Sequence, residues 1–259
     1  MLLFGHRGAA AERPENTLPA FERAIEAGAD VLETDVHATA DGHIVVSHDE
    51  TGERMAGVAA EIRGSTLAEV RRWDAGWGFL AADGRRPFAG AGYRIPTLEE
   101  LLCAFPTARF NVDIKQERPP IAAAVVELLR RERAEERVTL ASFSIRTMRQ
   151  VRALGYRGQT ALAQRELVYL LGLPAAAWRL FGFAGDRVQV PVRHGPVRFA
   201  SRRFVAKCHA LGLAVDFWTI DDPSEAEGLL NLGADGIMSD DPARLAPLFE
   251  RRRCVTAAA

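Results

Sequence analysis

Short apolar runs alternate with amphipathic, helix-like stretches along almost the whole chain, and this alternation limits the fold more than any other feature. Strict alternation of this kind indicates a parallel sheet, because each helix returns the chain to the end of the sheet where the next strand begins. Eight such strand–helix units in 259 residues favour an α/β fold of the closed (β/α)₈ type, the TIM barrel, over an open sheet. The predicted strands are Leu2–Phe4, Val31–His37, Arg109–Lys115, Val138–Ser142, Gln159–Leu162, Val188–Val190, Ala214–Thr219 and Gly236–Met238.

The length also favours one domain. A single barrel of this type takes ~250 residues, so we expect one domain over residues 1–259. A Gly-rich stretch, approximately 49–96, interrupts the alternation after the second strand and its short extension at Ile44–Ser47. It contains one helical piece near Leu67–Trp73, and we interpret it as a small insertion into the barrel. No GxGxxG or Walker-type loop follows a strand, which argues against a nucleotide-binding fold.

Charge and cysteine content narrow the classes of function. The 33 basic and 34 acidic residues give a net charge of −1, so the chain lacks the basic excess typical of nucleic-acid binding. We therefore expect no nucleic-acid partner, and we expect any recognition of an anion to be local. The three cysteines, Cys103, Cys208 and Cys254, are widely separated and odd in number. Together with an N-terminus that lacks a signal-peptide pattern, they predict reduced thiols and a cytoplasmic location.

Carboxylates concentrate where the second and third predicted strands end. Glu33 and Asp35 alternate along the second strand and so share one face, and Asp113 lies on the third strand. Adjacent carboxylates pointing into a barrel are unfavourable unless a cation compensates them, and the hard ions Mg²⁺ and Ca²⁺ prefer such oxygen ligands. Lys115 and Arg7, also at strand ends, add positive charge. The set predicts a pocket for an anion such as phosphate, whose developing charge the cations would stabilise.

Two histidines also lie at predicted strand ends. His6 directly follows the first strand, and His48 follows the extension of the second. A histidine pair across a phosphate can divide acid–base work, because imidazole titrates near neutral pH. One ring would take a proton from the attacking oxygen while the other protonates the leaving alcohol. We expect structural or solvated roles for the other histidines, which are His37, His43, His194 and His209.

Four short motifs occur in the order of a known enzyme family. They are His6-Arg7-Gly8, Pro14-Glu15-Asn16-Thr17, Glu33-Thr34-Asp35-Val36 and His48-Asp49, and together they resemble the glycerophosphodiester phosphodiesterases. The resemblance extends over nearly the full length of the chain. Further matching segments are Arg54, Thr66-Leu67, Asp74-Ala75-Gly76, Ile95-Pro96-Thr97-Leu98, Asn111-Val112-Asp113-Ile114-Lys115, Ser142-Phe143-Ser144, Phe217-Trp218-Thr219-Ile220-Asp221 and Gly233–Pro242.

The resemblance implies a TIM barrel that hydrolyses glycerophosphodiesters to sn-glycerol 3-phosphate and an alcohol. In the mechanism proposed for the family, the glycerol 2-hydroxyl attacks phosphorus, and water then opens the resulting cyclic phosphate. The resemblance gives His6 and His48 the general base and acid roles, without deciding which residue has which. The resemblance also implies that Glu33, Asp35 and Asp113 bind one divalent cation, Mg²⁺ or Ca²⁺. It implies that Arg7 and Lys115 bind phosphate and that Trp218 contacts the glycerol. Glu15 and Asn16 would orient the site from behind.

Two positions depart from the family pattern. The third-strand acid is commonly Glu, whereas Asp113 is one methylene shorter. Either the metal lies nearer to strand three, or a water molecule intervenes. After Trp218 the family commonly has Asn where this chain has Asp221. We interpret Asp221 as the cap of the following helix, a position where Asp is favoured; the alternative is an added charge at the rim of the site.

Residues 167–185 are strongly apolar and contain a single charge, Arg179. The segment approaches the length of a transmembrane helix, but Pro174 and three glycines interrupt it. Three interpretations stay open: a core helix with a hydrophobic loop, a dimer contact, or a surface that docks on a membrane or on acyl chains. Docking would favour lysophospholipids or glycerophosphoinositides over soluble glycerophosphocholine.

The expected partner is a small-molecule glycerophosphodiester, with peripheral membrane contact through 167–185 as a further hypothesis and the oligomeric state open. Two alternative functions stay open as well. One is a lysophospholipase D-like enzyme of the same family that acts on membrane lysolipids, and the other is a degenerate protein that only binds phosphate esters. The retained His6 and His48 argue against the second alternative, since a binding protein needs no acid–base pair.

Overall fold

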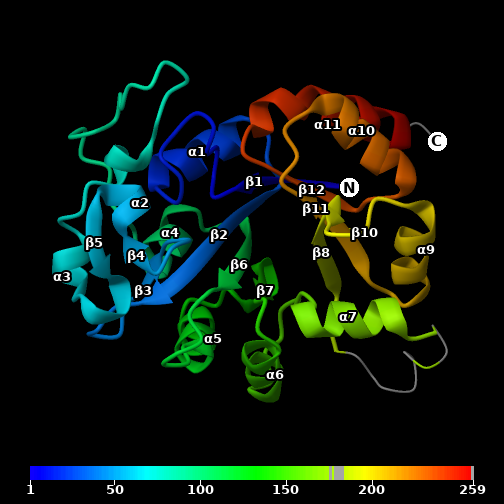
Figure 1. Ribbon diagram of the computed structural model, residues 1–259, viewed down its shortest axis with the longest axis horizontal. Helices are drawn as coiled ribbons and strands as arrows, with labels where there is room; N and C mark the ends of the chain where they lie inside the picture. Colours follow the sequence, from blue (N-terminus) through cyan, green and yellow to red (C-terminus); the bar gives the residue numbers. More distant parts are fainter. Residues whose placement is uncertain (175–176, 178–183, 258–259) are drawn as a thin grey trace.

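Parallel strands form a curled sheet at the centre of the molecule (Figure 1). The computed structural model describes residues 1–174, 177 and 184–257. The strand order is β7-β6-β2-β1-β12-β11-β8, and each neighbouring pair is parallel. A short strand, β3 (Ile44–Val46), pairs antiparallel with the end of β2. The parallel strands are β1 (Leu2–His6), β2 (Val31–Ala38), β6 (Arg109–Ile114), β7 (Val138–Ala141), β8 (Arg187–Pro191), β11 (Ala214–Trp218) and β12 (Gly236–Ser239).

One predicted strand is wrong. Gln159–Leu162 forms only two single bridges, from Thr160 to β7 and from Ala161 to β8. Side chains take backbone groups that a longer ladder would use: Thr160 N donates to Asp186 Oδ2 at 2.7 Å, and Ala161 O accepts from Arg152 Nη2 at 2.9 Å. The bridges still link the two outer strands of the sheet, so the architecture is the predicted TIM-barrel-like α/β fold.

Helices cover the outer face of the sheet, and the main core lies between these two layers (Figure 1). Outward-facing residues of the strands, such as Leu32 and Val112, pack with Phe21 of α1 and Leu101 of α4, all of them fully buried or nearly so. Burying such side chains provides most of the folding free energy. The helices are α1 (Leu18–Glu26), α4 (Leu98–Ala104), α5 (Ala122–Arg131), α6 (Ile145–Ala153), α7 (Gln164–Gly172), α9 (Arg202–Ala210), α10 (Pro223–Leu232) and α11 (Pro242–Ala257).

The predicted insertion after the second strand is confirmed and has a small core of its own. Trp73, Val70 and Ile62 pack there against Val45 of β3, which joins the insertion to the barrel. Its elements are short: β4 (Thr51–Gly52), α2 (Glu53–Ala56), β5 (Val58–Glu61), the 3₁₀ turns Ile62–Gly64 and Ala75–Gly78, and α3 (Leu67–Val70).

The apolar segment predicted at 167–185 begins on α7. Only part of this helix is buried: Leu170 is inaccessible, whereas Val168, Tyr169 and Leu171 are exposed. Residues 175–176 and 178–183 of the segment lie outside the described residues. In the part of the chain that the structure describes, no helix has both the length and the apolar character needed to span a membrane.

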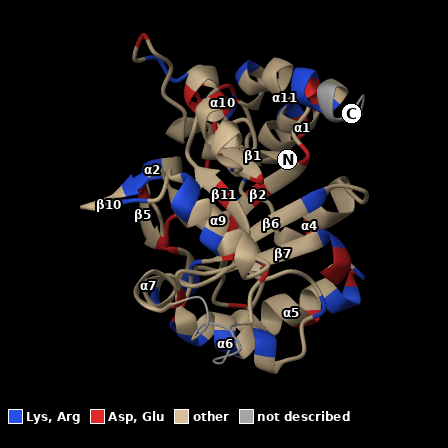
Figure 2. Cartoon of the chain, turned by 90° about the vertical axis from the view of Figure 1, so that its right-hand side faces the viewer, with Lys and Arg blue, Asp and Glu red and all other residues tan. Residues whose placement is uncertain are grey.

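Two further elements complete the fold, a 3₁₀ turn at Glu135–Arg137 and the hairpin of β9 (Arg193–His194) and β10 (Val197–Arg198). Figure 2 shows basic and acidic residues interspersed over the helices, in keeping with the balanced charge of the chain. Recognition of an anion must therefore rely on a local site.

Candidate active site

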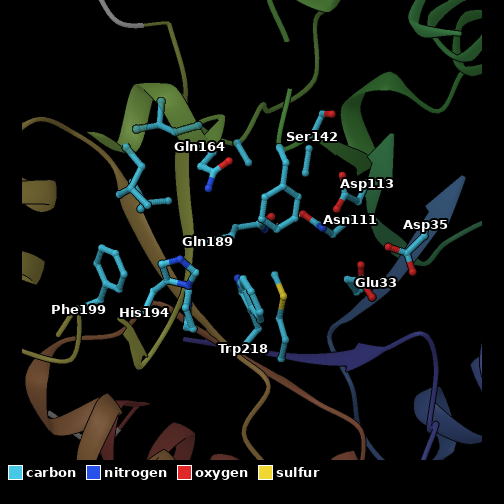
Figure 3. Close-up of a pocket in the computed structure, with 18 of the residues that line it drawn as sticks. Glu33, Asp35, Asn111, Asp113, Ser142, Gln164, Gln189, His194, Phe199 and Trp218 are labelled. Carbon is cyan, nitrogen blue, oxygen red and sulfur yellow. Dashed lines mark hydrogen bonds between the residues drawn. The ribbon is translucent and has the colours of Figure 1, made fainter. Parts of the chain in front are cut away.

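A pocket of about 400 Å³ opens at the carboxyl ends of the parallel strands, where active sites of this architecture lie. Its two sides differ in chemistry (Figure 3). The residues of the polar side are His6, Arg7, Glu33, Asp35, His48, Asn111, Asp113 and Lys115. The largely apolar side includes Phe143, Leu162, Leu167, Val168, Leu171, Val197, Phe199 and Trp218. We call the whole cavity the strand-end pocket.

The three predicted carboxylates lie together on the polar side. Asp35 of β2 is in register with Asp113 of β6, so the two carboxylates occupy neighbouring positions on adjacent strands. Glu33 is two residues before Asp35 on the same face, and Figure 3 shows all three on one side of the pocket. Their exposed fractions are only 5%, 1% and 8% for Glu33, Asp35 and Asp113. Buried carboxylates at this density need compensating positive charge.

Two cations supply part of that compensation. Lys115 Nζ lies 3.0 Å from Asp35 Oδ1 and 2.7 Å from Asp113 Oδ2. The backbone N–H of Arg7 donates to Glu33 Oε2 at 3.0 Å, and Arg7 Nε lies 3.4 Å from Asp35 Oδ2 without a hydrogen bond. Both residues predicted to bind phosphate therefore line the pocket beside the acidic cluster.

The pKa values show where the compensation is incomplete. Burial, together with the charge of Asp35, raises the pKa of Glu33 from 4.5 to about 7. Burial also raises the pKa of Asp113, although Lys115 opposes the shift. Burial acts the same way on Asp35, but Lys115 and Arg7 outweigh it, so the pKa of Asp35 is lowered. The negative charges of ionised Glu33 and Asp113 are thus not fully compensated by the neighbouring cations.

The oxygen donors of the acidic cluster are of the type that suits a hard divalent cation. Asp113 Oδ1 is buried and has no hydrogen-bond partner, which is costly for a carboxylate oxygen. The donor set, from Glu33, Asp35 and Asp113, consists of carboxylate oxygens, the type that Mg²⁺ and Ca²⁺ prefer. Among the residues that the structure describes, no three acidic, histidine or cysteine side chains already converge closely enough to ligate one ion. Lys115 instead lies between two of the carboxylates.

His6 lies at the end of β1 with both ring nitrogens near carboxylates. Nδ1 donates to Asp240 Oδ1 at 2.7 Å, and Nε2 is 3.9 Å from Glu33 Oε2. Burial opposes protonation of the ring, but Glu33 and Asp240 outweigh it and raise the pKa of His6. Asp240, which immediately follows β12, was not among the predicted site residues.

His48 lines the same pocket from the start of the insertion. Its Nδ1 donates to Asp49 Oδ1 at 2.7 Å. Asp49 Oδ2 in turn accepts a 2.6 Å hydrogen bond from Arg54 Nε, and Arg54 also binds both carboxylate oxygens of Glu15 at 2.7 and 2.8 Å. Glu15 Oε1 accepts from Arg7 Nη1 at 3.0 Å. The contacts of Glu15 are therefore with the two arginines, which is compatible with its predicted orienting role.

Asn16 and His37 contact residues of the site: Asn16 contacts the side chains of Asp35 and Thr34, and His37 contacts the backbone of His48. Asn16 Nδ2 lies 3.3 Å from Asp35 Oδ2, and Asn16 Oδ1 accepts from Thr34 Oγ1 at 2.9 Å. His37 does not line the pocket, as expected, but its Nε2 lies 3.2 Å from the carbonyl oxygen of His48. Burial lowers the pKa of His37, so this buried ring stays neutral near pH 7 while it donates to that carbonyl.

The aromatic side of the pocket contains the predicted Trp218. Its ring is 6.3 Å from that of Phe143 in an edge-to-face arrangement. His194, an exposed residue of the β9–β10 hairpin, lines the same side (Figure 3), and its expected structural or solvated role stays a prediction. Gln189, which was not predicted, lines the pocket and donates to Asn111 Oδ1 at 2.7 Å.

The interpretation of Asp221 as a helix cap is wrong. Asp222 caps α10, because its side chain accepts from the backbone N–H groups of Ser224 and Glu225. Asp221 Oδ1 instead accepts from the Ser239 hydroxyl at 2.7 Å and from the backbone N–H of Asp240 at 2.8 Å. Asp221 therefore fixes the turn that carries the partner of His6.

Comparisons with known proteins agree with this geometry. The sequence profile of the glycerophosphoryl diester phosphodiesterase family matches residues 6–244. A glycerophosphodiester phosphodiesterase of Caldanaerobacter subterraneus is 32% identical over 96% of this chain and 98% of its own. A probable glycerophosphodiester phosphodiesterase 2 of Mycobacterium tuberculosis is 36% identical over 92% of this chain and 87% of its own. The structure of an Oleispira antarctica phosphodiesterase in complex with the product sn-glycerol-3-phosphate has a TM-score of 0.79 at 25% identity and covers 96% of this chain and 97% of its own.

Proposed function

Because the chain belongs to the glycerophosphoryl diester phosphodiesterase family, we propose that it hydrolyses glycerophosphodiesters to sn-glycerol 3-phosphate and an alcohol, by histidine acid–base catalysis and with a divalent cation. The observation that carries the proposal is the pocket itself. Two histidines, three buried carboxylates and two basic side chains line one cavity at the carboxyl ends of the strands.

The histidines supply the proton transfers. In the first step, one of His6 and His48 takes the proton of the glycerol 2-hydroxyl as its oxygen bonds to phosphorus, and the other protonates the departing alcohol oxygen. The cyclic phosphate is then opened by water with the two roles exchanged, which returns both rings to their starting protonation states. Arg7 and Lys115 bind phosphate oxygens and stabilise their charge.

The divalent cation would be held by Glu33, Asp35 and Asp113. When bound, it would polarise the phosphate and neutralise negative charge on its oxygens. The buried, unpartnered Oδ1 of Asp113 and the raised pKa of Glu33 support this role, since both indicate missing positive charge. The oxygen donors favour Mg²⁺ or Ca²⁺ and do not discriminate between them.

A product assay tests the proposal. The protein is incubated with sn-glycero-3-phosphocholine, with EDTA or with Mg²⁺ or Ca²⁺, and sn-glycerol 3-phosphate is measured enzymatically. We expect turnover that EDTA abolishes and that the metal restores. His6→Ala and His48→Ala should each lower kcat by about 10²–10⁴-fold. His209→Ala is the matched control, because that histidine pairs with Asp235 on the surface outside the pocket.

Three results would contradict the proposal. Activity that survives alanine at both pocket histidines would remove the catalytic assignment. Full activity in EDTA would remove the metal, and binding of the diester without turnover under any of these conditions would favour the phosphate-ester-binding alternative.

The apolar side of the pocket favours a second candidate substrate, a lysophospholipid. Leu167, Val168 and Leu171 of α7 form one wall together with Phe143 and Phe199, and Val168 and Phe143 are more than half exposed. A single hydrocarbon chain on the glycerol would bury apolar surface there, at about 25 cal/mol per Å². Leu167, Val168 and Leu171 also belong to the segment 167–185 that is predicted to contact a membrane.

Matched charge substitutions separate the two substrates. Val168→Asp should lower kcat/KM for lysophosphatidylcholine at least tenfold and leave glycerophosphocholine turnover nearly unchanged. Leu80→Asp is the control, because Leu80 is 59% exposed and does not line the pocket. Failure of the wild-type protein both to cleave lysophospholipids and to sediment with phosphatidylglycerol vesicles would exclude the lipid candidate.

A further inference from the structure

We propose that Asp240 and Asp49 are positioning residues, each of which holds one of the two pocket histidines through its Nδ1 so that Nε2 faces the substrate. The inference rests on the proposed function for the roles of His6 and His48. It adds two carboxylates that neither line the strand-end pocket nor belong to the acidic cluster.

The backbone that carries the Asp240 carboxylate is held in place. One carboxylate oxygen accepts from His6 Nδ1 at 2.7 Å. The backbone N–H of Asp240 donates to Asp221 Oδ1 at 2.8 Å, and its carbonyl oxygen accepts from the N–H of Ala11 at 2.9 Å. Both backbone groups are thus fixed, by the loop after β11 and by the loop after β1. A carboxylate anchored in this way restricts the rotation of the imidazole ring that it binds.

The carboxylate of Asp49 is held by a different device with the same result. One oxygen accepts from His48 Nδ1 at 2.7 Å, and the other accepts from Arg54 Nε at 2.6 Å. Arg54 is in turn bound by both oxygens of Glu15. The backbone of His48 is restrained as well, because its carbonyl oxygen faces His37 Nε2 at 3.2 Å.

The symmetry of the two pairs matches the demands of a two-step reaction. A neutral ring that donates Nδ1–H to a carboxylate must carry its lone pair on Nε2, which suits a general base. The same carboxylate stabilises the protonated ring, which suits a general acid. Because His6 and His48 exchange these roles between the two steps, both need a partner that supports both forms.

A third histidine–carboxylate pair lies outside the pocket, so a carboxylate beside a histidine does not by itself indicate a positioning role in catalysis. His209 Nε2 lies 2.7 Å from Asp235 Oδ2, but both side chains are about 40% exposed and lie outside the pocket. That carboxylate pairs with Nε2 of the ring, whereas in His6 and His48 the carboxylate pairs with Nδ1 and Nε2 is the nitrogen proposed to face the substrate. It therefore provides a matched control.

The kinetic test combines substitutions at each pair. Asp240→Asn and Asp49→Asn should each lower kcat by about 10–100-fold, the range seen when partners of functional histidines are removed, with KM within about twofold. Asp240→Asn should have little further effect in a His6→Ala background, because the carboxylate acts through the ring. Asp235→Asn should leave kcat unchanged.

A spectroscopic test is independent of activity. In metal-free protein above pH 9, imidazole ¹⁵N NMR spectra should show His6 and His48 with hydrogen on Nδ1, and Asp240→Asn should shift only His6 away from that tautomer. Thermal melting checks that each variant is folded. The inference is overturned if the tautomers of the wild-type rings place hydrogen on Nε2, or if the Asn variants retain full kcat while His6→Ala and His48→Ala lose it. Full activity in the two Ala variants would instead overturn the proposed function.

Discussion

The raised pKa of Glu33 predicts an unusual dependence of stability on pH in the metal-free protein. The folded-state pKa is about 7, against an ordinary value of 4.5. Between these two values the folded chain binds a proton at Glu33 that the unfolded chain has released. Stability contributed by this group is therefore greatest at low pH and decreases as the pH rises from about 4.5 to 7.

The size of the effect follows from the shift. At about 1.4 kcal/mol per pKa unit, the difference corresponds to about 3 kcal/mol lost between pH 4.5 and 8. Glu33 is almost completely buried, so solvent screening reduces this value little. The raised pKa of His6 acts in the same direction, whereas the lowered pKa of Asp35 acts in the opposite direction. A variant that changes only Glu33 is therefore needed.

The assay is urea unfolding in EDTA at several pH values from 4.5 to 8, on the wild type and on Glu33→Gln, which keeps the shape and removes the charge. Glu33→Gln should become progressively more stable than the wild type as the pH rises. Mg²⁺ or Ca²⁺ at 1,000 times its Kd should reverse the order at pH 8, because it adds about 4.1 kcal/mol to a protein that binds it, more than the loss at Glu33. A pH-independent difference between the two proteins in EDTA would refute the reasoning.

Three further predictions concern other parts of the structure. Arg187→Met leaves the buried Asp216 carboxylate without its guanidinium and should lower the free energy of unfolding in urea by about 3–5 kcal/mol, a loss that adding Asp216→Leu should largely recover. Gly8→Ala places a Cβ 2.6 Å from the backbone of Ala20 at a φ of +87°, so thermal denaturation should show a loss of about 2 kcal/mol or more. Lys115→Met would remove the phosphate contact proposed for Lys115, worth about 1.5–3 kcal/mol, so initial-rate measurements should show KM raised about tenfold or more.

The acidic cluster was predictable from sequence because it depends on local rules. Side chains two residues apart on a strand share a face, which places Glu33 beside Asp35. Parallel strands end at the same edge of the sheet, which brings Asp113 to the same place. His6 was predictable on the same grounds, since it ends the first strand.

The partner of His6 was not predictable in this way, whereas Asp49, the partner of His48, directly follows it in the sequence. Asp240 is 234 residues from His6 along the chain, and nothing local distinguishes it among 34 acidic residues. The error at Asp221 was avoidable, because Pro223 marks the first helical position and so assigns the cap to Asp222. The strand predicted at Gln159–Leu162 failed because side chains from α6 and from the residue before β8 took its backbone groups, which is a tertiary effect.

The two sides of the strand-end pocket are encoded in different parts of the chain. The residues proposed for catalysis and metal binding lie between His6 and Lys115, whereas the apolar wall comes from residues between Phe143 and Trp218. Substitutions in α7 or in the β9–β10 hairpin can therefore alter which substrates fit without disturbing the groups proposed to move protons. An architecture divided in this way can diverge in substrate range while its chemistry is retained, and it offers a route to engineered variants in which only α7 and the β9–β10 hairpin are randomised.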